Sequence, residues 1–161
     1  MKMKHIVMAA ALALAPCVMN AQVAVKHIQT ETSPIATGVW AGDTFYLSGQ
    51  LPSPVTPADA TKGVAADYGD TKAQAASVFA KIQAALKTQG LDMKDVVKMT
   101  VFLSADPKTG KLEFAQMNSE YVKYFGTKDQ PNKPARSAVQ VAALVAPWAA
   151  LEIEVIAVKG K

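Results

Sequence analysis

Arg136 is the one arginine among the 17 basic residues of this chain. Its guanidinium presents a planar fork of N–H donors that can bind a carboxylate through two hydrogen bonds, whereas lysine offers a single ammonium. Lysine fills every other basic position, and Arg136 begins an apolar run typical of a strand. We therefore interpret Arg136 as a clamp for a small carboxylate, the alternative being an ordinary surface charge.

Two glutamates, Glu152 and Glu154, alternate with the apolar residues Leu151, Ile153 and Val155. Successive side chains of a strand point to opposite faces, so both carboxylates face away from the core. They are then either solvated residues of an outward face, or one of them lines a pocket and holds a water for hydrolysis.

Ser48 and Asn118 are two further polar candidates for a pocket. Ser48 ends a strand-like run, and His27 is the one histidine after residue 21. No histidine other than His27 is available to activate Ser48, so a serine–histidine triad is not expected, and we interpret Ser48 as a hydrogen-bond donor. Asn118 stands among apolar residues, where it could be a cap, a helix-surface residue or a pocket contact.

Residues 1–21 have the pattern of a secretory signal peptide: Lys2 and Lys4 precede an apolar run over 6–18, and Ala21 is a small residue. The apolar run is shorter than the 18 or so residues of a membrane anchor. The sequence thus predicts a signal peptide over 1–21 and one domain over 22–161. The domain is expected to be periplasmic or secreted, with no membrane attachment once the signal is removed.

Loss of the signal removes Lys2, Lys4 and Cys17, which changes the formal charge from +4 to +2. A domain without cysteine has no disulfide, no catalytic thiol and no Cys/His zinc site. Its dispersed lysines lack the basic cluster of a nucleic-acid surface, so no nucleic-acid partner is expected.

A β-hairpin is predicted over residues 39–52, where Gly42-Asp43 separates two aromatic and β-branched runs. Alternation in the second arm places Phe45, Leu47 and Gly49 on one face. The preceding segment 22–30 is a candidate edge strand.

The segment 70–89 has apolar residues at the spacing of one helix face. Thr71 and Gln74 have the spacing of a capping box at its start, and Gly90 stands where a helix-terminating glycine belongs.

Strands and a second helix complete the chain. Residues 96–104 alternate, with Val97 on the same face as Met99, Val101 and Leu103, and residues 114–125 form an amphipathic helix that Gly126 stops. Two closing strands, 136–145 and 151–159, are expected to pair antiparallel, which puts Arg136 and Glu152 on neighbouring strands. The order β-β-α-β-α-β-β predicts an α+β fold with two helices on one face of a sheet.

Five segments appear together in an order that is similar to a known family. They are LSGQLP (47–52), GLDMKDVVKMTVFL (90–103), FAQMNSEYVKYF (114–125), PARS (134–137) and LEIEVIAV (151–158). In this combination the chain resembles the reactive-intermediate deaminase family, RidA/YjgF.

The resemblance implies a chorismate-mutase-like α+β fold with a mixed sheet, assembled as a homotrimer with a barrel-like core and clefts between subunits. It implies hydrolysis of 2-enamine and 2-imine acids to 2-oxo acids and ammonia without a cofactor. The substrate would be a small imine or enamine that bears a carboxylate.

Carried over residue by residue, the resemblance makes Arg136 the carboxylate clamp and Glu152 the residue that orients water. Ser48, Asn118 and Ala138 would line the same pocket, Ala138 through its backbone. The chain departs from the family at Ile35, where many deaminating members have a tyrosine. The alternative function is a non-catalytic trimeric binder of small carboxylates in the cell envelope.

Overall fold

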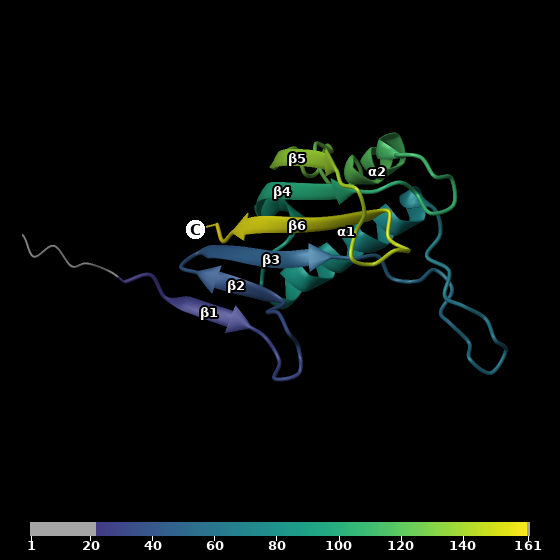
Figure 1. Cartoon of the computed structure of the whole chain (residues 1–161). Helices are drawn as coiled ribbons and strands as arrows, with labels where there is room; N and C mark the ends of the chain where they lie inside the picture. The colour runs from purple at the N-terminus through teal and green to yellow at the C-terminus, as the bar shows by residue number, and fades with distance from the viewer. Residues whose placement is uncertain (1–21, 161) are drawn as a thin grey trace, which may run out of the picture.

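A mixed sheet of six strands forms one layer, and two α-helices form the other, in a computed structural model that describes residues 22–160 (Figure 1). The predicted signal peptide therefore lies outside the described residues. The elements are β1 (Val25–Ile28), β2 (Gly38–Ala41), β3 (Thr44–Gln50), α1 (Thr71–Thr88), the 3₁₀ turn η1 (Met93–Asp95), β4 (Val96–Leu103), α2 (Phe114–Tyr121), β5 (Ala135–Gln140) and β6 (Leu151–Val158).

The strand order across the sheet is β1-β2-β3-β6-β4-β5, and only β4 and β5 pair in parallel. The predicted antiparallel pairing of the two closing strands is wrong, because β6 lies between β3 and β4 and does not pair with β5. Helix α2 connects β4 to β5, and a helical crossover of this kind joins parallel strands. β5 is consequently an edge strand, while β6 has a neighbour on each side.

The predicted hairpin and edge strand are confirmed. Ala41 pairs with Thr44 across a two-residue loop in which Gly42 has φ +59°, a conformation that glycine adopts without a steric penalty. β1 continues the sheet beside β2.

Apolar residues of β3, β4 and β6 face the helices and form the core with α1 and α2. The predicted inward orientation of Val97 is wrong: Val97 is 47% exposed, and Val96 is buried instead. The register of β4 against β6 shifts between Val96 and Lys98, and such a bulge moves one residue out of the alternation.

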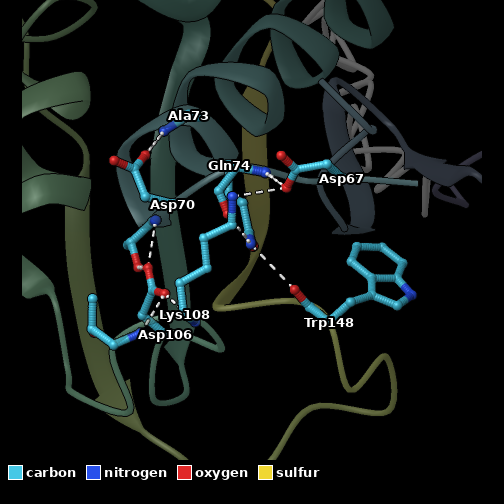
Figure 2. Close-up of polar contacts among 10 residues, drawn as sticks. Asp67, Asp70, Ala73, Gln74, Asp106, Lys108 and Trp148 are labelled. Atoms are coloured by element: carbon cyan, nitrogen blue, oxygen red, sulfur yellow. Dashed lines mark hydrogen bonds and ion pairs between the residues drawn. The ribbon is translucent and has the colours of Figure 1, made fainter. Parts of the chain in front are cut away.

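The start of α1 differs from the predicted capping box. Asp70 is the N-cap, and its carboxylate accepts a hydrogen bond from Ala73 N at 2.9 Å. Thr71 instead donates through its backbone N and its hydroxyl to the carboxylate of Asp106, at 2.7 and 2.6 Å (Figure 2). Asp106 is fully buried and also accepts from the backbone of Lys108 and Thr109. Gly90 has φ +73° just after the helix, as predicted.

Gln74 joins α1 to the connection that leads into β6 (Figure 2). Its side-chain amide accepts from Ala150 N at 2.8 Å and donates to Trp148 O at 3.2 Å and Gly69 O at 3.4 Å. Because Gln74 is only 1% exposed, these backbone groups have little access to water as a replacement partner. Gln74 therefore helps to set where β6 begins.

The segment between β3 and α1 projects from the body as an arm (Figure 1). Isolated bridges join Thr56 to Asp67 and Asp59 to Val64. At its base, Asp67 forms an ion pair with Lys108 at 2.8 Å, and the ring of Tyr68 stacks on Trp148 with centroids 3.7 Å apart.

Helix α2 ends at Tyr121, four residues earlier than predicted, and turns carry the chain to Gly126 at φ +74°. Phe114, expected on its buried face, is 41% exposed. Within the described residues, neither helix is long and apolar enough to cross a membrane.

Replacing Asp106 by alanine is expected to lower the free energy of unfolding by about 3 kcal/mol, because Thr71 at the start of α1 and the backbone of Lys108 and Thr109 lose a charged acceptor. Burial raises the pKa of Asp106, but the hydrogen bonds from Thr71, Lys108 and Thr109 outweigh it and hold that pKa below its ordinary value. A lowered folded-state pKa contributes stability above the ordinary pKa of about 4, which is lost as the pH falls through the folded-state value.

Urea unfolding of wild type and the variant at pH 7 and pH 3 measures this effect. The difference in unfolding free energy should be smaller at pH 3. An equal difference at the two pH values would contradict a role for the ionised carboxylate.

Candidate functional site

Arg136 lies on the helix-facing side of β5, at the edge of the sheet. Its backbone partner in β4 is Met99, a fully buried core residue, and paired residues share a face. The guanidinium carbon lies 4.1 Å from the ring centroid of Tyr121 and 5.8 Å from that of Phe114, both on α2. Nη2 donates a hydrogen bond to Asn118 Oδ1 at 3.0 Å.

One donor group of Arg136 has no partner. Nη1 is buried and makes no hydrogen bond within the described residues, whereas buried donors are usually paired. A carboxylate would supply the missing acceptor through a charge-assisted hydrogen bond. Because Nη1 is shielded in this conformation, the guanidinium has to shift slightly for a ligand to reach it.

Glu152 lies on the opposite face of the sheet. It is preceded and followed by the buried Leu151 and Ile153, and its partner in β4 is Phe102. The predicted outward orientation of Glu152 and Glu154 is confirmed. On this face the carboxylate of Glu152 lies against Gly49 of β3, so closely that a Cβ added at Gly49 would collide with Oε1.

Alternation predicted that Gly49 shares a face with Phe45 and Leu47, and this prediction is wrong. Leu47 pairs with Val155 and Gln50 with Ile153, so β3 carries an extra residue against β6. A bulge of this kind redirects a side-chain position, and here it leaves room for a carboxylate.

Ser48 holds the segment before β2 against β3. Its hydroxyl donates to Ala36 O at 2.7 Å, which confirms the donor role but gives it a backbone acceptor. The neighbouring Ile35 is 63% exposed, and its backbone is held by the side chain of Ser33. Ser48 therefore holds the backbone next to Ile35 against β3.

The predicted site residues thus form two groups within one chain. The arginine group consists of Arg136, Asn118 and Tyr121, with Ala138 two residues along the same face of β5. The glutamate group consists of Glu152, Gly49 and Ser48.

The expectation that Arg136 and Glu152 lie on neighbouring strands is wrong, because β4 separates them. They are two strands apart, about 10 Å across the sheet, and their partners in β4 differ by three residues, about 10 Å along it. They also point to opposite faces. One small molecule cannot contact both residues of a single chain.

Tyr121 and Gly49 are the members of these groups that the sequence did not single out. Tyr121 follows Asn118 by three residues, the spacing at which two side chains share a helix face. That spacing could have linked Tyr121 to Asn118. The sequence carries no comparable signal for Gly49, because its orientation depends on the bulge.

The face of the sheet away from the helices is mixed in character. Large apolar side chains are exposed on it at Tyr46, Val139 and Val158. A shallow hollow of about 120 Å³ lies at its centre, lined in part by Lys98 and Glu154. Lys98 Nζ donates to Ser137 Oγ at 3.0 Å.

Across residues 22–160, no three His, Cys, Asp or Glu side chains come together as a potential metal site. Two basic residues lie at the features of the sheet: Arg136 lies beside Tyr121 and Asn118, and Lys98 lines the hollow on the other face.

Comparison with known proteins gives a consistent result over nearly the whole described chain. Residues 22–159 match the family model described as Endoribonuclease L-PSP. A "RutC family protein" of Haemophilus influenzae is 39% identical over 137 residues, which is 82% of this chain and 95% of the relative. A Salmonella typhimurium protein named "2-iminobutanoate/2-iminopropanoate deaminase" is 34% identical and covers 83% of this chain and 98% of its own.

Solved structures share the fold. The structure of "E. coli TdcF with bound serine" superposes with a TM-score of 0.63 at 34% identity, covering 84% of this chain and 99% of the other.

Proposed function

The chain belongs to the endoribonuclease L-PSP family, also called RidA/YjgF, and from this premise we propose that it hydrolyses 2-enamine and 2-imine acids to 2-oxo acids and ammonia. The observation that carries the proposal is the buried, unpaired Nη1 of Arg136, for which a substrate carboxylate would supply a charge-assisted hydrogen bond. The deaminase name of the Salmonella relative supports the same reaction class.

In the proposed reaction, Arg136 binds the substrate carboxylate and fixes the position of the neighbouring C=N carbon. Glu152 accepts a proton from a water, and the water oxygen bonds to that carbon. The C=N electron pair moves to nitrogen, which takes up a proton to give a carbinolamine. Glu152 returns its proton to this nitrogen, the C–N bond breaks as the hydroxyl loses its proton to solvent, and ammonia leaves with the 2-oxo acid as product. An imine is already electrophilic, so positioning and proton transfer account for the chemistry.

We propose that a homotrimer completes the site, with Arg136 of one subunit facing Glu152 of the next. The separation of the two residues within one chain requires a second copy if both act on one substrate. The exposed Tyr46, Val139 and Val158 on the open sheet face are apolar area that an assembly would bury. Ser48, Asn118 and Ala138 are proposed to line the cleft.

We also propose that residues 1–21 direct export and that the domain over 22–161 acts in the periplasm or outside the cell. Sequencing the N-terminus of the exported protein would locate the cleavage site. A nucleic acid is not proposed as substrate, because the chain without residues 1–21 has a formal charge of only +2 and dispersed lysines.

The reaction is tested by generating 2-imino acids in place with an amino-acid oxidase and adding the chain without residues 1–21. Wild type should accelerate imine loss and ammonia release. Binding of 2-oxo acids without any acceleration would favour the alternative, a non-catalytic carboxylate binder.

The shared site is tested by mixing two inactive variants, Arg136→Ala and Glu152→Gln, under conditions that exchange subunits. A cleft that takes Arg136 from one variant and Glu152 from the other is intact, so random mixing of equal amounts should restore about a quarter of wild-type activity. Each variant mixed with itself is the control. No recovery despite subunit exchange, shown by mass, would contradict a site shared between subunits.

A further inference from the structure

The ring of Tyr121 covers the guanidinium of Arg136 more closely than any other aromatic side chain described. The distance from the guanidinium carbon to the ring centroid is 4.1 Å, well within the 6 Å or so over which a ring attracts a cation. Phe114 lies at 5.8 Å, near that limit. Tyr121 is nearly buried, so water competes little for the cation at this position.

Tyr121 is itself held in place by an aromatic stack. Its ring is stacked on that of Phe125, with centroids 4.9 Å apart and planes inclined by 26°, and lies 6.3 Å from that of Phe79. Phe79 and Phe125 are fully buried or nearly so. The ring is therefore a fixed surface, whereas the side chain of Arg136 is long and flexible.

Asn118 and Tyr121 together restrict the guanidinium in two ways. Asn118 Oδ1 accepts a hydrogen bond from Nη2, which limits rotation of the guanidinium. Attraction to the Tyr121 ring limits movement of the guanidinium away from α2. Nη1 is the donor left without a partner. A guanidinium held on one surface loses less freedom when it binds a carboxylate than one that moves in solvent.

We propose that Tyr121 is a positioning residue for substrate binding: its ring, not its hydroxyl, holds Arg136 against α2, from where a slight shift of the guanidinium presents Nη1 to the carboxylate. This inference rests on the proposed function in taking Arg136 as the carboxylate donor. It assigns to Tyr121 an effect on affinity for every ligand that carries the carboxylate, substrate and product alike.

The test measures the Kd of 2-oxobutanoate, a product-type carboxylate, by NMR titration. Tyr121→Leu should raise the Kd about tenfold, because the attraction between ring and cation is lost. Tyr121→Phe keeps the ring and should stay within about twofold of wild type. In the imine assay, Tyr121→Leu should raise KM and leave kcat nearly unchanged.

Phe125→Leu is the matched structural control. It removes a ring from the same stack, and the described contacts of Arg136 with aromatic rings do not include Phe125. This variant should lower Tm while the Kd stays at the wild-type value. An equal rise in Kd in Phe125→Leu and Tyr121→Leu would overturn the proposal, since the effect would then be one of folding.

An unchanged or tighter Kd in Tyr121→Leu would also overturn the proposal, the tighter Kd indicating that Tyr121 retracts Arg136 from the ligand. The NMR signal of the Arg136 Nε proton gives a readout that needs no ligand. It should be displaced by the ring current in wild type and Tyr121→Phe and should return to the ordinary position in Tyr121→Leu. If 2-oxobutanoate binds in this pattern but imines are not hydrolysed, the proposed function fails and the role of Tyr121 stands.

Discussion

Arg136→Ala is expected to lower kcat/KM for imine hydrolysis by about 10²- to 10³-fold, because removing one partner of a shielded, hydrogen-bonded charge pair costs about 2–5 kcal/mol. The loss should fall mainly on KM and on the affinity for 2-oxo acids, since the guanidinium contacts the carboxylate and not the carbon that reacts. Steady-state kinetics together with the 2-oxobutanoate titration measure the two effects.

Arg136→Lys is the matched variant for this prediction. It keeps the charge but not the planar fork that reaches Asn118 and the ligand together. It should recover only a small part of the loss. Full activity in Arg136→Lys would show that charge alone suffices, and full activity in Arg136→Ala would contradict the clamp.

Glu152→Gln is expected to lower kcat by about 10²- to 10⁴-fold, the range over which a positioned acid or base accelerates proton transfer. The amide has nearly the shape of the carboxylate but cannot accept the proton of water. The Kd of 2-oxobutanoate should stay close to wild type, because Glu152 is proposed to hold the attacking water and not the carboxylate of the ligand. This opposite pattern separates the role of Glu152 from that of Arg136.

Glu154→Gln is the matched control, since Glu154 lies on the same strand and the same face, two residues further along. It does not lie against Gly49 and should keep wild-type kcat. Equal losses in Glu152→Gln and Glu154→Gln would indicate a general effect of charge on this face and contradict a specific base.

Gly49→Ala should resemble Glu152→Gln in kcat. The added Cβ would collide with the carboxylate of Glu152, so the glutamate side chain would have to move. The backbone of Gly49 does not have a positive φ, so the substitution brings no backbone strain with it. A wild-type kcat in Gly49→Ala would show that the position of Glu152 is not critical.

Much of the local structure could be predicted because it depends on residues close together in the chain. The hairpin at Gly42, helix α1 and its terminating Gly90 follow from turn chemistry and from the spacing of apolar residues. The predicted capping box of Thr71 and Gln74 rests on the same kind of local spacing, but it is wrong. Asp106, 35 residues further along the chain, provides Thr71 with a buried acceptor. Local spacing cannot show a competing partner from another element.

The strand order could not be predicted from alternation alone. Alternation shows which residues of β5 and β6 face the same way, but it does not show which strand each pairs with. The expected pairing of β5 with β6 placed Arg136 beside Glu152, and the insertion of β6 between β3 and β4 separates them. The bulge in β3 could not be predicted either, because it depends on the register of β3 against β6. It turns Gly49 toward Glu152.

By itself the sequence determined the type of chemistry to look for: a lone arginine on a strand and a carboxylate on the outer face of another, in a chain of the RidA/YjgF family. These are properties of composition and of the two-residue period of strands, which need no knowledge of pairing. Only the tertiary structure decided that Arg136 lies against Tyr121 and Asn118 on one face and Glu152 against Gly49 on the other. The physical reason is that strand pairing and register are set by burial across the whole sheet, and they alone determine which side chains of distant segments can meet.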